Sequence, residues 1–315
     1  MPTPPARRIA RLASLLAVVA VQAMAAAPPA PLPHVATGRI MRLQETSRFV
    51  PAQTVDVWLP PGYPAQAPYA VLYMFDGQML FDAAQTWNHQ SWHAADTAAA
   101  LIRDGRTRPF IIVGLWNAGE RRESAYYPQK VWRSLTDAQR RRARAMELKL
   151  PVEPYSDDTL RFLVDELRPR IDRRFRVAAD AADTTVMGSS MGGLMAMYAI
   201  SEYPRVFGGA GCLSTHWPGT ALQPHADNPS PDAFVAYLRA HAPAPAGHRV
   251  YFDHGTATLD AMYAPTQQRV DRLFRARGYT NADFRSAVSP GAAHTEDAWA
   301  ARLDQPMTFL LPPRR

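Results

Sequence analysis

The sequence predicts an α/β protein with a mainly parallel central sheet, helices on both faces and an inserted cap segment. Short β-branched and apolar runs alternate with helix-forming stretches along most of the chain, which is typical of right-handed βαβ units. These runs are apolar throughout, as expected for strands that are covered on both faces. One long polar segment interrupts the alternation and predicts the insertion.

The sheet is expected to begin with an antiparallel part and to continue as parallel strands. Residues 39–49 and 54–59 form two strand-like segments joined by a short connection, and a turn cluster at 60–64 follows them. The apolar run 71–75 ends at Asp76-Gly77 and has the composition of a buried parallel strand. Further strands are expected at 109–115, 184–187, 208–213, 249–252 and 283–288, and helices at 91–103, 159–174, 194–202, 231–242, 267–277 and 296–310.

The polar segment 117–157 is too long to be an ordinary connection. Segments of this length are more often functional than idle, so we expect an insertion with its own short helix that forms a cap beside the functional site. The insertion contains the basic cluster Arg140-Arg141-Arg142 with Arg144. We interpret this cluster as a solvated helix face rather than as an anion site.

Residues 1–25 have the pattern of a secretory signal peptide. A basic start with Arg7, Arg8 and Arg11 precedes an apolar stretch that is too short for a stable anchor, and Ala-Met-Ala at 23–25 matches a cleavage site. A Pro/Ala-rich spacer, 26–38, would then lead into the domain, 39–315. Cleavage predicts a periplasmic or secreted protein, and an uncleaved membrane anchor is the alternative.

Composition argues against several classes of partner and cofactor. The net charge of +7 falls by three charges to +4 without the signal arginines, which is not the footprint of a nucleic-acid binder. The histidines are scattered without metal-ligand spacing, and the chain has no glycine-rich nucleotide loop, so no metal or cofactor is expected. Cys212 lies in an apolar stretch and should be a buried structural thiol. No stable membrane insertion is expected after cleavage, since no other apolar run is long enough.

The most informative motif is Gly-Ser-Ser-Met-Gly at 188–192, which has the form G-x-S-x-G with Ser190 at its centre. A β-branched run precedes it and good helix formers follow it. Strand, sharp turn and helix form the context of a nucleophile elbow, in which glycines stand where a Cβ would collide with neighbouring chain. Ser190 is therefore the predicted nucleophile.

A serine nucleophile needs a base, and the base needs an orienting acid. After such an elbow the chain order is serine, acid, histidine, and His294 is the only histidine beyond Asp260. Asp260, in the loop after the strand at 249–252, is our first choice for the acid. Asp253, at the tip of that strand, is the alternative, although it could instead brace the turn. Glu296 is too close to His294 in sequence and is expected to cap the last helix.

The tetrahedral intermediate of acyl transfer needs preorganised N–H donors. One is the backbone N–H of Met191, directly after the nucleophile. The second is expected from Gln78, in the loop after the strand at 71–75, where Gly77 allows close backbone approach.

The candidate pocket residues are Asp76, Arg121, His216 and Trp217. Arg121 stands at the start of the insertion, where it could contact an anionic or polyhydroxylated substrate. His216 and Trp217 follow the first strand after the elbow helix. Aromatic residues in these loops could stack on a sugar, a phenolic acyl group or a catecholate, and are about as often plain packing.

These residues together resemble the "putative esterase" family of α/β-hydrolases. That family includes S-formylglutathione hydrolase, feruloyl and acetylxylan esterases, siderophore-trilactone esterases and the mycolyltransferase antigens. The matching stretches are 72–78, 188–193, 253–256 and 291–299. The resemblance implies an α/β-hydrolase fold, with Ser190 as nucleophile, His294 as base, and Gln78 and Met191 as oxyanion donors. It leaves both candidate acids open.

The expected function is therefore that of a serine carboxylic-ester hydrolase that works through an acyl-enzyme. Its partner would be a small-molecule or carbohydrate ester, namely an acylated carbohydrate, a phenolic ester or a siderophore lactone. Acyl transfer to a sugar or lipid acceptor is the alternative. A catalytically inactive binding module that retains the nucleophile elbow is a remote alternative.

Overall fold

The computed structural model describes Met1 and residues 30–314. Apart from Met1, the predicted signal peptide lies outside the described residues. From Leu32 onward the chain forms one compact unit. Within the described part of the chain, no helix is both long and apolar enough to cross a membrane.

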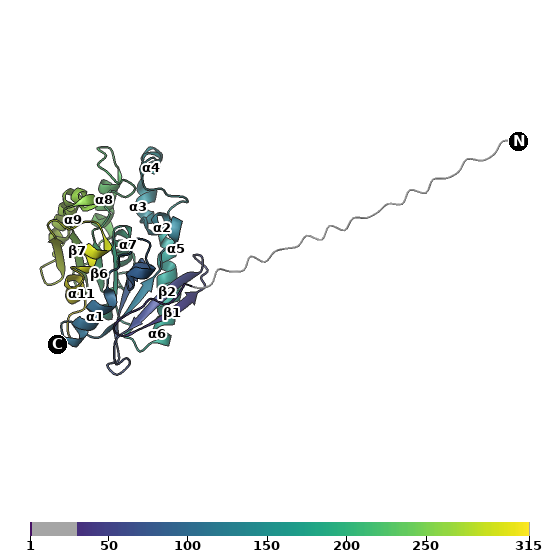
Figure 1. Cartoon of the computed structure of the whole chain (residues 1–315). Helices are drawn as coiled ribbons and strands as arrows, with labels where there is room; N and C mark the ends of the chain where they lie inside the picture. The colour runs from purple at the N-terminus through teal and green to yellow at the C-terminus, as the bar shows by residue number, and fades with distance from the viewer. Residues whose placement is uncertain (2–29, 315) are drawn as a thin grey trace. The chain divides into compact units, whose positions relative to one another are not determined.

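The strands of the compact unit form a single sheet with helices around it (Figure 1). The sheet has eight strands, in the order β1-β2-β4-β3-β5-β6-β7-β8. β2 pairs antiparallel with both β1 and β4, and every other neighbouring pair is parallel. The predicted sheet, antiparallel at its start and parallel afterwards, is therefore confirmed. The strands are β1 (Arg39–Glu45), β2 (Gln53–Leu59), β3 (Ala70–Phe75), β4 (Phe110–Leu115), β5 (Thr184–Ser189), β6 (Gly209–Leu213), β7 (Arg249–His254) and β8 (Phe284–Val288).

Both faces of the sheet are covered, as the unbroken apolar runs predicted. Along β3, Val71 and Tyr73 belong to one hydrophobic cluster, and Leu72 and Met74 belong to the other. The first cluster includes residues of α2 to α9, and the second includes residues of α1, α10 and α11. The helices are α1 (Ala94–Arg103), α2 (Arg122–Tyr126), α3 (Gln129–Ser134), α4 (Asp137–Arg144), α5 (Ser156–Arg161), α6 (Arg168–Arg174), α7 (Met191–Glu202), α8 (Ser230–His241), α9 (Ala264–Ala276), α10 (Glu296–Ala300) and α11 (Asp304–Leu310).

Two long helices that the sequence predicted are interrupted. The stretch 296–310 divides into α10 and α11, because Pro306 has no N–H for a continuous helix and is tolerated only in the first turn of α11. The stretch 159–174 carries a π-helical segment, Phe162–Leu167, between α5 and α6. Pro169 follows that segment and likewise lacks the N–H that a regular turn requires.

The other element ends differ from the sequence prediction by a few residues. β1 stops at Glu45, four residues before the predicted end of that strand, and α1 starts at Ala94 rather than at residue 91. The insertion 117–157 holds three short helices, α2 to α4, and the start of α5, where one helix was predicted.

Part of the predicted spacer packs onto the domain. The backbone N–H of His34 donates to Asp82 Oδ2 at 2.9 Å, and Trp58 Nε1 donates to the carbonyl of Thr37 at 2.9 Å. The compact unit therefore includes residues 32–38, ahead of β1.

Candidate active site

Ser190 stands at a sharp turn between β5 and α7. Its φ of 57° and ψ of −123° lie outside the regions that L-residues normally adopt. The backbone N–H of Ser190 donates to the carbonyl of Leu213 at 3.0 Å, which ties the turn to β6. A Cβ at Gly188 would lie 2.6 Å from the carbonyl oxygen of Gly192, so only glycine fits there. The geometry is that of the predicted elbow.

The side chain of His294 is held by Asp260. His294 Nδ1 and Asp260 Oδ1 are 2.6 Å apart, and the carboxylate of Asp260 is fully buried. Asp260 Oδ2 accepts from the Gly255 N–H at 2.5 Å and from Ser214 Oγ at 2.6 Å. Burial raises the pKa of Asp260, but the hydrogen bonds and the His294 imidazole outweigh burial and hold that pKa below its ordinary value.

The direction of the Ser214 hydroxyl follows from its other partners. Trp299 Nε1 and Arg302 Nη2 both lie within donating distance of Ser214 Oγ, at 2.9 and 3.0 Å. Because indole and guanidinium nitrogens only donate, the Ser214 proton is left for Asp260. Ser214 therefore strengthens the ionised state of Asp260.

Asp253 belongs to a different pair. Arg302 Nε and Nη2 donate to its two carboxylate oxygens at 3.0 and 3.1 Å, and both side chains are buried. The histidine is thus bonded to Asp260, and Asp253 is bonded to an arginine. The bonding pattern favours Asp260 between the two acids that the sequence left open.

Asp76 lies at the end of β3 in a left-handed conformation with φ 58°. Arg122 Nε and Nη2 donate to its two oxygens at 2.6 and 2.7 Å, and Asn117 Nδ2 donates at 2.7 Å. Burial lowers the pKa of Arg122, but the charge and hydrogen bonds of Asp76 outweigh this and raise it above its ordinary value. The Asp76–Arg122 pair ties the first helix of the insertion to the sheet.

Gln78 lies in a 3-10 turn, η1 (Gly77–Met79), directly after Asp76. A Cβ on Gly77 would meet the carbonyl group of Gly114 at 2.5 Å, so glycine allows this turn to sit against β4. Met191 is the first residue of α7, where a backbone N–H has no partner within the helix. Their roles as oxyanion donors remain predictions.

Ser190, His294, Asp76 and Gln78 all line one pocket of about 730 Å³. Ser190 and His294 line it together with residues of the insertion and of the segment before α1. The lining is completed by Asp76, Gln78, Met79, Trp87, Asn88, Gln90, Trp92, Asn117, Gly119, Arg122, Glu123, Ser189, Thr295, Glu296 and Trp299.

Three predicted pocket residues lie elsewhere. Arg121 is exposed and is absent from the lining, where its neighbour Arg122 appears. His216 is fully buried and bonds Tyr263 Oη through Nδ1 at 2.7 Å. Trp217 is buried too, with its ring against Phe252.

Glu296 also departs from its prediction. The side chain of Thr295 caps α10 by accepting from the Ala298 N–H, whereas Glu296 lines the pocket and accepts from Asn88 Nδ2 at 2.7 Å. Sequence reasoning did not identify Asn117, Ser214 or Arg302, because no motif marks a residue whose partner is far away in the chain.

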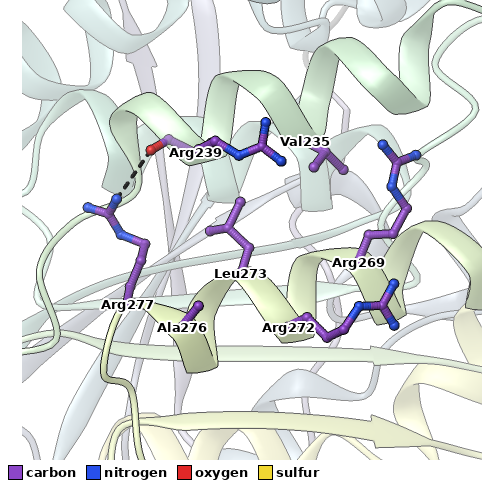
Figure 2. A pocket seen from close by; sticks show the side chains of 7 residues that line it. All are labelled: Val235, Arg239, Arg269, Arg272, Leu273, Ala276 and Arg277. Atoms are coloured by element: carbon purple, nitrogen blue, oxygen red, sulfur yellow. Dashed lines mark hydrogen bonds between the residues drawn. The ribbon is translucent and has the colours of Figure 1, made fainter.

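A second groove, of about 460 Å³, lies between α8 and α9 (Figure 2). Arginines surround an apolar floor there, and two of them are engaged within the protein. Arg277 donates to the carbonyl of Arg239 at 3.2 Å, and Arg269 pairs with Asp232 at 2.8 Å. Its lining contains no serine, histidine or carboxylate, so the catalytic candidate is the Ser190 pocket.

Comparisons with solved structures agree with this architecture. A ferulic acid esterase superposes with a TM-score of 0.60 at 18% identity, over 89% of this chain and 99% of that one. The enterobactin esterase FES from Shigella flexneri superposes with a TM-score of 0.62 at 18% identity, over 90% of this chain and 63% of that one. The protein therefore has the α/β-hydrolase fold.

Sequence comparison identifies the family. An endo-1,4-beta-xylanase/feruloyl esterase from Xylanibacter ruminicola is 30% identical over 55% of this chain, and the match spans only 21% of that relative. The Bacillus subtilis protein YbbA, described as uncharacterized, is 21% identical over 76% of this chain and 84% of its own length. The family model "Putative esterase" matches residues 48–310. The chain belongs to this esterase family.

Proposed function

We propose that this esterase hydrolyses carboxylic esters through Ser190, His294 and Asp260. The observation that carries the proposal is the bond from His294 Nδ1 to the buried carboxylate of Asp260, at a pocket that both His294 and Ser190 line. With Nδ1 held by Asp260, Nε2 is the nitrogen left to take a proton.

In the proposed reaction, Ser190 Oγ attacks the ester carbonyl while His294 Nε2 takes the hydroxyl proton. The tetrahedral oxyanion accepts hydrogen bonds from the N–H groups of Gln78 and Met191. Collapse expels the alcohol, to which His294 returns the proton, and leaves an acyl-enzyme. A water molecule then attacks the acyl group by the same route and releases the acid. Asp260 stays ionised and stabilises the imidazolium at each stage.

Replacing Ser190 with alanine tests the nucleophile. We expect kcat for 4-nitrophenyl acetate to fall by about 10⁴-fold or more, since the proposed acyl-enzyme forms on the Ser190 hydroxyl. An unchanged circular dichroism spectrum would show that the fold survives. Labelling of the wild-type protein by a fluorophosphonate, and its loss in Ser190→Ala, gives an independent readout. Residual turnover within tenfold of wild type would refute the assignment.

For the natural substrate we propose an acylated carbohydrate or a phenolic ester, with a siderophore lactone as a third class. The structural relatives include a ferulic acid esterase and an enterobactin esterase. Trp87 lines the pocket and is exposed, so its indole provides a flat apolar surface for such groups. Trp92 and Trp299 also belong to the lining but are buried.

We further propose that the protein acts in the periplasm or outside the cell, because residues 1–25 have the pattern of a signal peptide. N-terminal sequencing of the exported protein tests this proposal. The expected new N-terminus lies at about residue 26, and a mature protein that starts at Met1 would contradict it.

A further inference from the structure

The side chains that line the Ser190 pocket carry more negative than positive charge. Three carboxylates, those of Asp76, Glu123 and Glu296, share the lining with a single cationic side chain, that of Arg122. Arg122 donates to both oxygens of Asp76, at 2.6 and 2.7 Å, so these two charges offset one another. The negative charges of the two glutamates remain in excess.

Neither glutamate has its charge removed by its immediate partners. Glu296 Oε2 accepts from Asn88 Nδ2 at 2.7 Å, and a neutral amide fixes a carboxylate without cancelling its charge. Glu123 Oε1 lies 3.7 Å from Arg122 Nη1, but that guanidinium already donates two hydrogen bonds to Asp76. The pocket thus keeps an excess negative potential.

Charges just behind the lining do not reverse this balance. Asp260 is a buried carboxylate bonded to His294, and Arg302 is offset by Asp253. On the short turn beside the pocket, Glu120 and Arg121 carry opposite charges and are adjacent in sequence.

The pocket also offers an aromatic surface suited to a cation. Trp87 lines the pocket while 83% of its surface is exposed, and it directly precedes Asn88, which holds Glu296. An indole face attracts positive charge and repels negative charge through its quadrupole. Trp87 and Glu296 therefore favour the same sign of ligand charge.

We propose that this pocket selects uncharged and cationic esters over anionic ones, and that Glu123 and Glu296 set this selectivity. The inference rests on the proposed function, because it concerns the ester that Ser190 attacks. Among the three substrate classes, neutral acylated carbohydrates and phenolic esters fit this charge. A siderophore lactone whose catecholates hold iron carries net negative charge and fits it poorly.

The selectivity is measured with three 4-nitrophenyl esters of similar acyl length. The butyrate is neutral, the hemisuccinate is anionic, and the 4-(trimethylammonio)butyrate is cationic. We expect kcat/KM to be about tenfold higher for the neutral than for the anionic ester, a scale within reach of two charges near a protein surface. The cationic ester should match or exceed the neutral one. The gap should narrow between about 0.02 and 0.5 M NaCl, because salt screens such charges.

The variants Glu123→Gln and Glu296→Gln test the two glutamates. The quantity compared is the ratio of kcat/KM for the anionic ester to kcat/KM for the neutral ester, which does not depend on overall activity. Each substitution should raise the anionic-to-neutral ratio of kcat/KM about threefold, and the double variant should raise it further. Asp232→Asn, which removes an exposed carboxylate beside the distant α8/α9 groove, is the matched control and should leave the ratio unchanged.

Two results would overturn the selectivity: an anionic ester hydrolysed as fast as the neutral one, or a ratio that neither glutamate variant moves. Failure of the proposed function has a different signature. If Ser190→Ala kept full activity towards all three esters, the nucleophile would be wrong whatever the charge preference.

Discussion

Asp253 and Asp260 are seven positions apart, and both side chains are completely buried, yet their surroundings differ. Asp253 faces the guanidinium of Arg302, which donates to both of its oxygens. Asp260 faces the imidazole of His294, together with two donors from the chain, Ser214 Oγ and the Gly255 N–H. Asp253 is thus paired with a permanent cation, whereas Asp260 is paired with an imidazole, a group that can gain and lose a proton.

One buried hydrogen-bond network therefore contains two kinds of ion pair: one that we interpret as structural, and one that we propose to take part in the reaction. Arginine stays protonated, and neither Asp253 nor Arg302 lines the Ser190 pocket, so we interpret this pair as a scaffold. In the proposed reaction His294 takes up and returns a proton, and Asp260 stabilises the imidazolium that forms. Ser214 connects the two halves, because its oxygen accepts from Arg302 and its proton is directed to Asp260.

The largest expected effect distinguishes the two acids directly. Asp260→Asn should lower kcat about 10⁴-fold, because an amide can hold His294 in the wrong tautomer and cannot stabilise the imidazolium. Asp253→Asn should lower kcat far less, although it disturbs Arg302. Steady-state kinetics on 4-nitrophenyl acetate, with thermal unfolding as a control for folding, compares them. A larger kcat loss in Asp253→Asn would transfer the catalytic role to that residue.

The next effect concerns stability. Arg302→Met should lower the free energy of unfolding by about 3 to 5 kcal/mol, because it leaves the Asp253 carboxylate buried without its cation. The double variant Asp253→Asn/Arg302→Met removes both charges and should regain much of that loss. Urea unfolding of the two variants measures the difference. If the single and double variants were equally stable, the pair would not be the scaffold inferred here.

The smallest effect concerns a buried group without a charged hydrogen-bond partner. Burial, with a smaller contribution from His294, lowers the pKa of His216 from 6.5 to about 3. Below pH 6.5 the unfolded chain therefore binds a proton at His216 that the folded protein does not, so folding stability falls as the pH drops from 6.5 towards 3. Between pH 7 and 5 this loss amounts to about 2 kcal/mol.

His216→Gln removes that titration. Urea unfolding at pH 7 and pH 5 should show the wild type losing about 2 kcal/mol more than the variant over this interval. Equal losses in the two proteins would mean that His216 is protonated in the folded state.

Prediction from the sequence was most accurate where neighbouring residues carry the signal. The expected run 71–75 became β3 (Ala70–Phe75), because an unbroken apolar run has few stable alternatives to a buried strand. The stretch 117–157 holds three short helices where the sequence predicted one. α2 and α3 have no side-chain cap, whereas α4 begins with a local capping box formed by Thr136 and Gln139.

Errors within the site share a physical cause. Arg121 was predicted and Arg122 lines the pocket, since one step along a helical turn rotates a side chain by about 100°. His216 and Trp217 follow a strand that leads to the site, but their side chains enter the core. Sequence position specifies where the backbone goes far better than which way a side chain points.

The sequence by itself determined the strand, turn and helix around Ser190, because the glycines and the flanking propensities that make such a turn are contiguous. It also restricted the candidate base to His294 through the order of residues along the chain. Only the tertiary structure decided which aspartate meets that histidine, which arginine pairs with Asp76, and that two glutamates remain in excess in the pocket. These outcomes depend on contacts between segments far apart in sequence, whose geometry no local pattern encodes.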